Sequence, residues 1–213
     1  ANSVAGLASC RDLQAMVLGL ARQWEEALAL LAQNDAVAAQ RRAFERCQTH
    51  QRRGWACDAL GRRDDALRER YALLAAAREA GDDAATAHAL GLLGGLHADL
   101  YNLEEAEALC AQAALLAERS GALQAWAIAT LNRMNALLGL GRGADTLPLA
   151  QALMAQGGES ITGGIELVVA KVVVGEAVPL VGTGLDGDVD DAAAGAAEFG
   201  GVLAGLDGEF LDG

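Results

Sequence analysis

The middle of the chain carries apolar residues at the spacing of an amphipathic helix. Residues 84–100 and 103–119 form two such runs, separated by the dipeptide 101–102. The apolar positions of the first run are Leu90, Leu93, Leu96 and Leu100. Intervals of three and four residues place these side chains on one stripe of a helix. The pattern predicts two helices joined by a short turn.

Residues at the ends of these runs support the same boundaries. Asp82 stands where a helix N-cap is expected, and Glu104 and Glu105 fall in the first turn of the second run. Arg119 closes that run and Gly121 follows it. Acidic residues at the start and a basic residue at the end complement the helix dipole, and glycine is a common C-cap.

The helix pair recurs along the chain with a period of 40 in sequence number. Matching segments in successive units have similar sequences, and a fainter copy lies upstream at a spacing of 79. The matching segments are 60–62 with 100–102 and 140–142, 80–81 with 120–121, and 23–27 with 102–106. Recurrence at this period is typical of stacked supersecondary units, so each unit is predicted to be a pair of antiparallel helices.

Small residues recur where the two helices of a unit should cross. Gly54, Gly94 and Gly95 are predicted to lie within first helices, where glycine is unfavourable by up to about 1 kcal/mol relative to alanine. Ala66 and Ala106 are the matching small residues of the second helices. We expect close helix approach at a glycine–alanine contact.

These motifs resemble the tetratricopeptide (TPR) repeat. The segment Leu90-x-x-Leu93-Gly94-x-x-His97, followed by Ala106-x-x-x-Cys110, is similar to the family signature W-x-x-L-G-x-x-Y and A-x-x-x-F. The resemblance extends over residues 11–157, and the long period is similar to that of repeats in bacterial signalling and transcription regulators. It implies an all-α fold, a right-handed superhelical array of antiparallel helix pairs.

In the TPR family the first helix of each pair lines a concave groove that binds a segment of a partner protein. The resemblance therefore implies a set of groove residues on three first helices. This set is Gln48, Gln51, Trp55, Asp58, His88, Gly91, Gly95, Asp99, Ile128, Leu131, Asn135 and Leu138. The alternative interpretation of Trp55 and Ile128 is that they belong to the core, because a shift of one residue in register reverses the assignment.

Charge divides the chain into two parts. Residues 1–157 hold 15 arginines and 18 acidic residues, whereas residues 158–213 hold one lysine, 11 acidic residues and 13 glycines. We expect a helical repeat domain over 1–157 and a Gly/Asp-rich tail over 158–213 with weak structure or a hairpin over 165–184. The tail contains a formal G-x-G-x-x-G at 182–187 and an incomplete calcium loop from 186, but its aspartates disfavour a dinucleotide and the loop lacks the required Gly and Glu.

The overall net charge of −13 disfavours direct nucleic-acid binding, and no apolar run is long enough to predict a membrane span. Four cysteines without C-x-x-C spacing are typical of a reducing cytoplasm. The arginines at 41, 42, 46, 52 and 53 form a cluster that could contact an acidic or phosphorylated partner, or pair with nearby acidic residues.

Three histidines and no recognisable catalytic motif give little support to an enzyme, a cofactor or a metal site. The sequence predicts a cytoplasmic scaffold that binds a protein or peptide segment. The alternative is a sensory or regulatory domain of a bacterial signalling enzyme of the nucleotide cyclase type, or of a transcriptional activator, with the output domain outside this chain. A third hypothesis is an enzyme that depends on the tail.

Overall fold

The computed structural model describes residues 4–156 of the chain. Within that range the secondary structure is entirely helical, which confirms the predicted all-α class. The tail over 158–213, with its predicted hairpin, glycine motif and calcium-like loop, lies outside the described residues.

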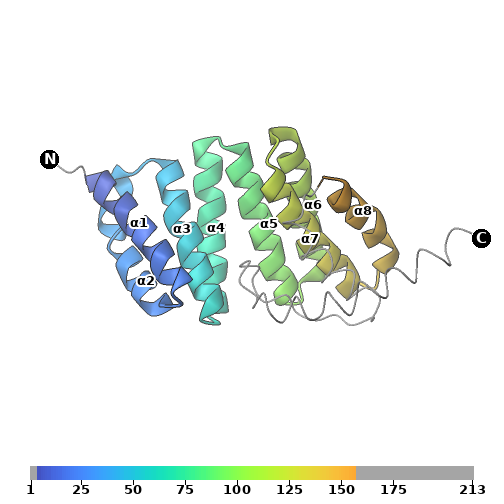
Figure 1. The fold of residues 1–213 in the computed structure, drawn as a ribbon, viewed down its shortest axis with the longest axis horizontal. Helices are drawn as coiled ribbons and strands as arrows, with labels where there is room; N and C mark the ends of the chain where they lie inside the picture. Colours follow the sequence, from blue (N-terminus) through green and yellow to red (C-terminus); the bar gives the residue numbers. More distant parts are fainter. Residues whose placement is uncertain (1–3, 157–213) are drawn as a thin grey trace, which may run out of the picture.

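Eight α-helices and two short 3-10 helices follow one another along the described part of the chain. The α-helices are α1 (Val4–Leu20), α2 (Trp24–Ala32), α3 (Ala43–Ala59), α4 (Arg63–Ala80), α5 (Asp83–Asp99), α6 (Leu103–Ser120), α7 (Leu123–Gly139) and α8 (Leu147–Gln156), and the 3-10 helices are Asp35–Gln40 and Gly143–Thr146. Neighbouring helices pack in a row from α1 at one end to α8 at the other (Figure 1).

The predicted ends of the central helix pair are confirmed. The carboxylate of Asp82 accepts a hydrogen bond of 2.9 Å from the backbone amide of Ala85, which is an N-cap interaction. Gly81 and Gly121 cap α4 and α6 in the left-handed conformation, with φ of 65° and 70°. Helix starts and stops are therefore determined by residues adjacent to them.

The turns inside the helix pairs repeat with the period seen in the sequence. Each turn from a first to a second helix contains one residue with positive φ: Arg22, Gly61, Tyr101 and Gly141. These four turn residues lie 39, 40 and 40 positions apart along the sequence. The turn at Arg22, which belongs to the faint upstream copy of the repeat, is therefore structurally equivalent to the other three. The described part of the chain therefore holds four equivalent turns between paired helices, which is compatible with a helical repeat.

The expected small-residue contact is present in one helix pair and altered in another. A Cβ added to Gly94 would overlap Cys110 Sγ and would lie 3.2 Å from the carbonyl oxygen of Ala106, so α5 and α6 approach closely there. At Gly54 the added atom would instead lie 3.2 Å from the guanidinium of Arg70. The missing side-chain volume in the α3–α4 pair is therefore filled by an arginine rather than by an alanine.

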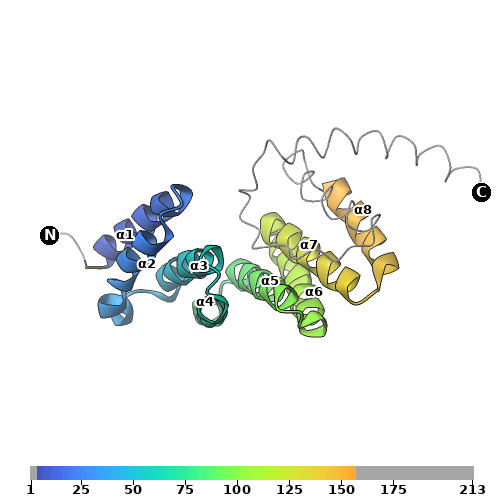
Figure 2. The ribbon, with the colours of Figure 1, turned by 90° about the horizontal axis from the view of Figure 1, so that it is seen from below.

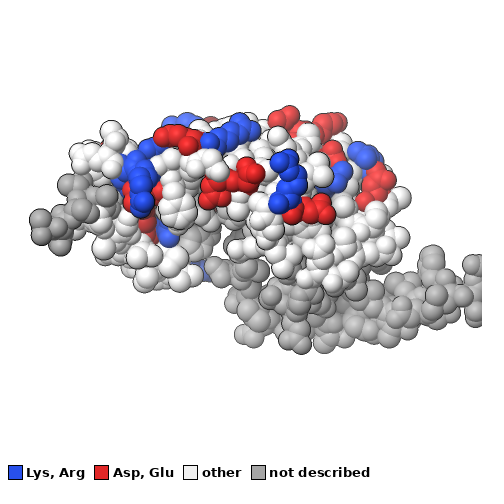
Figure 3. All heavy atoms as spheres, turned by 90° about the horizontal axis from the view of Figure 1, so that it is seen from above, with Lys and Arg blue, Asp and Glu red and all other residues white. Residues whose placement is uncertain are grey.

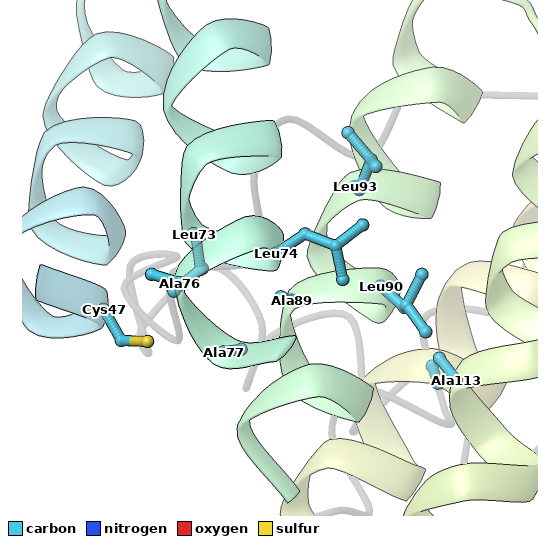
Figure 4. Close-up of a cluster of buried hydrophobic side chains, with 10 residues drawn as sticks. Cys47, Leu73, Leu74, Ala76, Ala77, Ala89, Leu90, Leu93 and Ala113 are labelled. Atoms are coloured by element: carbon cyan, nitrogen blue, oxygen red, sulfur yellow. The ribbon is translucent and has the colours of Figure 1, made fainter. Parts of the chain in front are cut away.

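The core consists of small clusters between successive helices. The largest joins Leu73, Leu74, Ala76 and Ala77 of α4 to Ala89, Leu90 and Leu93 of α5, with Cys47 and Ala113 at its margins (Figure 4). Leucine and alanine dominate because the chain has few aromatic residues. Such local clusters make stability depend on contacts between neighbours, as in other helical arrays.

The packing of first helices is not uniform along the row. Helix α5 packs extensively on α4, α6 and α7, whereas α3 and α5 make little backbone contact. The two views of the ribbon show α1–α4 and α5–α8 as two groups that meet where α4 packs on α5 (Figures 1 and 2).

Candidate partner-binding surface

Ionised side chains are unevenly distributed among the helices. Helices α3, α4 and α6 each carry several arginines, aspartates or glutamates, whereas Arg133 is the one ionised residue of α7. Figure 3 shows ionised side chains gathered along one long side of the molecule. The first helices α5 and α7 therefore offer mostly uncharged side chains.

A set of half-buried side chains follows the first helices α3, α5 and α7. We call this set the inner face. Its members are Gln48, Gln51 and Trp55 on α3, His88, Leu92 and Asp99 on α5, and Ile128 and Asn135 on α7, with the exposed Phe44 at its edge. Amides and apolar groups dominate the inner face, and Asp99 is its one carboxylate.

Trp55 is a packing residue as well as a member of this face. Its ring meets the ring of Trp24 edge to face, with centroids 4.8 Å apart. A Cβ added to Gly19 of α1 would lie 2.8 Å from the Trp55 ring, so the indole sits close against that helix. The alternative assignment of Trp55 to the core is supported by these contacts.

Gln51 and His88 link α3 to α5 across the inner face. The Gln51 amide nitrogen lies 3.1 Å from His88 Nε2. Burial lowers the pKa of His88 to about 4, and the nearby Arg70 guanidinium contributes to the same shift. The imidazole is therefore neutral at pH 7 and accepts the hydrogen bond of the amide.

Asp58 does not belong to the inner face. Its side chain is buried between α3 and α4, where Oδ2 accepts a hydrogen bond of 2.6 Å from Arg70 and Oδ1 lies 3.7 Å from Arg63. This position follows from the glycine at 54, which leaves room for the Arg70 guanidinium. Asp58 compensates the charge of a buried arginine instead of facing a groove.

The predicted residues of α5 and α7 divide into two groups. Gly91 and Gly95 face α7, where Asn132 donates a hydrogen bond of 3.0 Å to the Gly91 carbonyl. Leu131 and Leu138 pack on a cluster that includes residues of α8. The remaining predicted residues are half-buried on the inner face, namely His88, Asp99, Ile128 and Asn135.

Most of the arginine cluster is used in internal ion pairs. Arg41 is buried and contacts Asp12 at 2.5 Å and Thr49 Oγ1 at 2.5 Å. The other pairs are Arg42 with Glu45, Arg46 with Glu79, and Arg53 with Asp35 and Glu69. Arg52 bonds to Gln48 of its own helix, and burial lowers the pKa of its guanidinium. This arrangement favours the structural interpretation over a phosphate contact.

Sequence reasoning missed Asn132, Asp12 and Phe44. Asn132 is buried in the α5–α7 contact, and Asp12 forms a buried ion pair with the distant Arg41. No pattern in the neighbouring sequence predicts either contact, because the partner residues are far away along the chain. Phe44 was detectable, since it is an aromatic residue seven positions before Gln51, at the spacing of one helix face.

The described residues contain no cluster of ligating side chains suited to a metal ion, and none of their helices is long and apolar enough to cross a membrane. Burial raises the pKa of the Cys57 thiol to about 11 and of the Cys110 thiol to about 12, so neither is a reactive thiolate at pH 7.

Fold and surface together define an all-helical, repeat-like array of packed helices. Comparison with protein-family models, with curated proteins and with solved structures finds no match to this chain.

Proposed function

We propose that the chain is a TPR-like, cytoplasmic interaction scaffold that binds a segment of a partner protein on its inner face. The observation that carries the proposal is the composition of the inner face, which holds amides and apolar groups, whereas Arg46, Arg53 and Asp58 of the same helix α3 are held in ion pairs with residues outside this face. The proposal gives the chain no catalytic step.

The composition of the inner face favours a particular kind of ligand. The Gln48 oxygen already accepts a hydrogen bond from Arg52, and the Gln51 nitrogen already bonds to His88. The Gln48 amide nitrogen, the Gln51 amide oxygen and the Asn135 side chain suit the backbone of a bound segment. Phe44 and Ile128 supply apolar contact area. An uncharged segment, either extended or an amphipathic helix with its apolar side inward, matches these groups better than an acidic or phosphorylated one.

A regulatory role would use the same surface. If the complete gene continues into a nucleotide cyclase or a DNA-binding module, binding at the inner face would control that output domain. Sequencing the gene beyond this segment separates the free-standing scaffold from the sensory domain.

The binding surface is tested by capture of partners with the full chain and two variants. Ile128→Asp combined with Gln48→Ala alters the inner face at two half-buried positions and leaves Trp55 in place for packing. Leu115→Asp on α6, which is 64% exposed, is the matched control on the other side. We expect the first variant to lose at least tenfold in affinity for a captured partner and the control to lose none. Equal capture by all three proteins would exclude the inner face.

A further inference from the structure

The sequence after the described helices contains one apolar segment, which differs in composition from the residues that follow it. Of the 17 residues at 165–181, 12 are alanine, valine, leucine or isoleucine, and one lysine stands against two glutamates. Residues 182–213 hold eight acidic residues and no basic one. We call residues 165–181 the apolar segment. The strong negative charge of the tail lies mainly after it.

The composition of the apolar segment defines what kind of surface can bind it. Valine-rich sequences favour an extended backbone, whose amide and carbonyl groups need hydrogen-bond partners. Sequences that combine such residues with low charge aggregate when they are left exposed to water. The matching surface therefore offers apolar contact together with uncharged hydrogen-bonding groups.

The inner face offers this combination. Ile128 is half-buried and Phe44 is 52% exposed, so both present part of an apolar side chain. The Gln51 amide oxygen and the Asn135 side chain can bond to a backbone that lies beside them. No member of the inner face is basic at pH 7, so the face suits the apolar segment and does not suit the acidic residues after it.

Helix α8 brings the chain to the border of the inner face. Leu131 and Leu138 of α7 pack against a cluster that contains Leu153 of α8. Ile128 and Asn135 stand three residues before these two leucines, and residues three apart on a helix are neighbours on its surface. The part of the inner face that belongs to α7 therefore lies next to α8.

The connection between α8 and the apolar segment is long enough to reach this surface. Eight residues separate Gln156, the last residue of α8, from Ile165. They span up to about 30 Å, whereas α7 is about 25 Å long and packed helices lie about 10 Å apart. The apolar segment itself spans up to about 58 Å, enough to cross α7, α5 and α3. The exposed apolar residues of α1 lie beyond α3 at the opposite end of the row, so the tether favours the inner face (Figure 1).

We propose that the apolar segment binds the inner face of its own chain, with its side chains against Phe44 and Ile128 and its backbone bonded to the amides. This inference rests on the proposed function, because it assigns an occupant to the same surface. A short tether gives the segment an effective concentration of about 1 mM, so a weak contact keeps it bound. A partner has to displace the segment, which lowers its apparent affinity in proportion to the fraction of faces that are free.

Site-specific photo-cross-linking in the full chain tests the occupant. Cys10→Ser removes the exposed thiol and the other three cysteines are buried, so Val172→Cys can be labelled alone with benzophenone maleimide. We expect cross-links within one chain to the peptides of α5 and α7 that carry inner-face residues. Val202→Cys places the same label in the acidic part of the tail and should give little of this product.

Changes on two sides of the molecule then identify the surface that is cross-linked. In the labelled Val172→Cys chain, Ile128→Asp combined with Gln48→Ala should remove most of the intramolecular product. Leu115→Asp on α6 should leave the product unchanged, because this position is exposed and lies outside the inner face. Circular dichroism checks that every variant keeps its helix content. Products on α1, on α8 or on a second chain, or no product, would overturn the proposal.

Thiol reactivity gives an independent measurement. In the Cys10→Ser chain, Ile128→Cys places a thiol on the inner face, where the apolar segment should shield it from a disulfide reagent. Val169→Asp combined with Val173→Asp opens the face and should speed the reaction about tenfold. Val189→Asp in the acidic part of the tail is the matched control and should not change the rate. Equal rates in all three proteins would overturn the proposal.

Partner capture by the open variant, with Val169→Asp and Val173→Asp, separates this inference from the proposed function. Capture without intramolecular cross-linking excludes the apolar segment as the occupant and leaves the inner face as a binding surface for partners. Intramolecular cross-linking without capture by the open variant excludes the proposed function and leaves the contact between the tail and the inner face in place.

Discussion

At the scale of single residues, backbone conformation explains why two of the four equivalent turns are less favourable than the others. Gly61 and Gly141 adopt positive φ without steric cost, whereas Arg22 and Tyr101 adopt φ of 58° and 60°. A residue with a Cβ is less stable in this conformation by about 1 kcal/mol. The turns keep their geometry because the flanking helices determine it.

Tyr101→Gly should therefore increase the free energy of unfolding, by about 0.5–1 kcal/mol. The Tyr101 side chain is largely exposed, so little packing is lost. Gly141→Ala is the reverse change and should destabilise by a similar amount. Urea unfolding of both variants checks the prediction, and a destabilised Tyr101→Gly protein would contradict it.

His88 makes the stability depend on pH. Because burial lowers its pKa from 6.5 to about 4, the unfolded chain binds the proton more readily than the folded chain between these values. Neutral His88 contributes to the free energy of unfolding above pH 6.5, and this contribution is lost as the pH falls to 4. The loss in the free energy of unfolding amounts to about 3 kcal/mol. Below pH 4 both states are protonated and the loss stops.

His88→Gln keeps a polar partner for Gln51 but removes the titration. Melting temperatures of wild type and variant between pH 7 and pH 4 should converge as the pH falls, because the wild type loses more stability. Carboxylates titrate in both proteins, so the difference between them isolates His88. Parallel curves of melting temperature against pH would show that His88 is not buried as described.

At the scale of helices, two kinds of specific contact add to the apolar clusters between neighbours. Buried polar groups connect α1 to the following unit, where Asp12 contacts both Arg41 and Thr49. Close approach of glycine connects α5 to α6 and to α7. The buried polar contacts specify which helices pack together, and the glycines specify how closely they pack.

Asp12→Ala leaves the Arg41 guanidinium buried without its counter-charge. We expect a destabilisation of about 3–5 kcal/mol, with loss of α1 packing before the rest of the chain unfolds. Glu25→Ala is the matched control, since the Glu25–Arg62 pair is exposed and should contribute less than about 1 kcal/mol. Urea denaturation measures both, and equal effects would contradict the role of burial.

Gly94→Ala places a methyl group against Cys110 Sγ and should destabilise the α5–α6 pair by about 1–3 kcal/mol. Adding Cys110→Ala makes room for the new methyl group. The double variant should therefore be more stable than the sum of the two single changes implies. Denaturant unfolding of the three variants measures the difference, and an additive result would mean that the two side chains do not compete for the same space.

At the scale of the whole molecule, packing is strongest in the centre and weakest at the ends of the described array. Helices α5, α6 and α7 contact one another extensively, whereas α1, α2 and α8 have fewer neighbours and α3 makes little contact with α5. Because a helical array is stabilised by neighbour contacts, its parts open separately.

Amide hydrogen exchange should therefore be slowest in α5, α6 and α7 and fastest in α1, α2 and α8. The centre of α4 should be intermediate, because it joins the two groups through its contact with α5. Uniform protection along the chain would show that the array unfolds as one unit.

The sequence by itself determined the all-α class, the helices of the central pair with their ends, and the repeat period. These features depend on residues close together in the chain: the three- and four-residue spacing of leucines, the Asp82 N-cap, and the glycines at 81 and 121 that adopt positive φ. Gln48, Gln51, His88 and Asn135 lie on the inner face for the same reason, because helical periodicity assigns residues of one helix to one side.

Only the tertiary structure decided which side of each helix is covered. Successive residues of a helix differ in direction by about 100°, so a neighbouring helix covers or exposes a position according to its own placement. Asp58 is buried because Arg70 occupies the space beside Gly54, and Gly91 faces α7, where Asn132 bonds to its carbonyl from a distant point in the sequence. Partners this far apart along the chain are specified by packing, and no local pattern of residues encodes them.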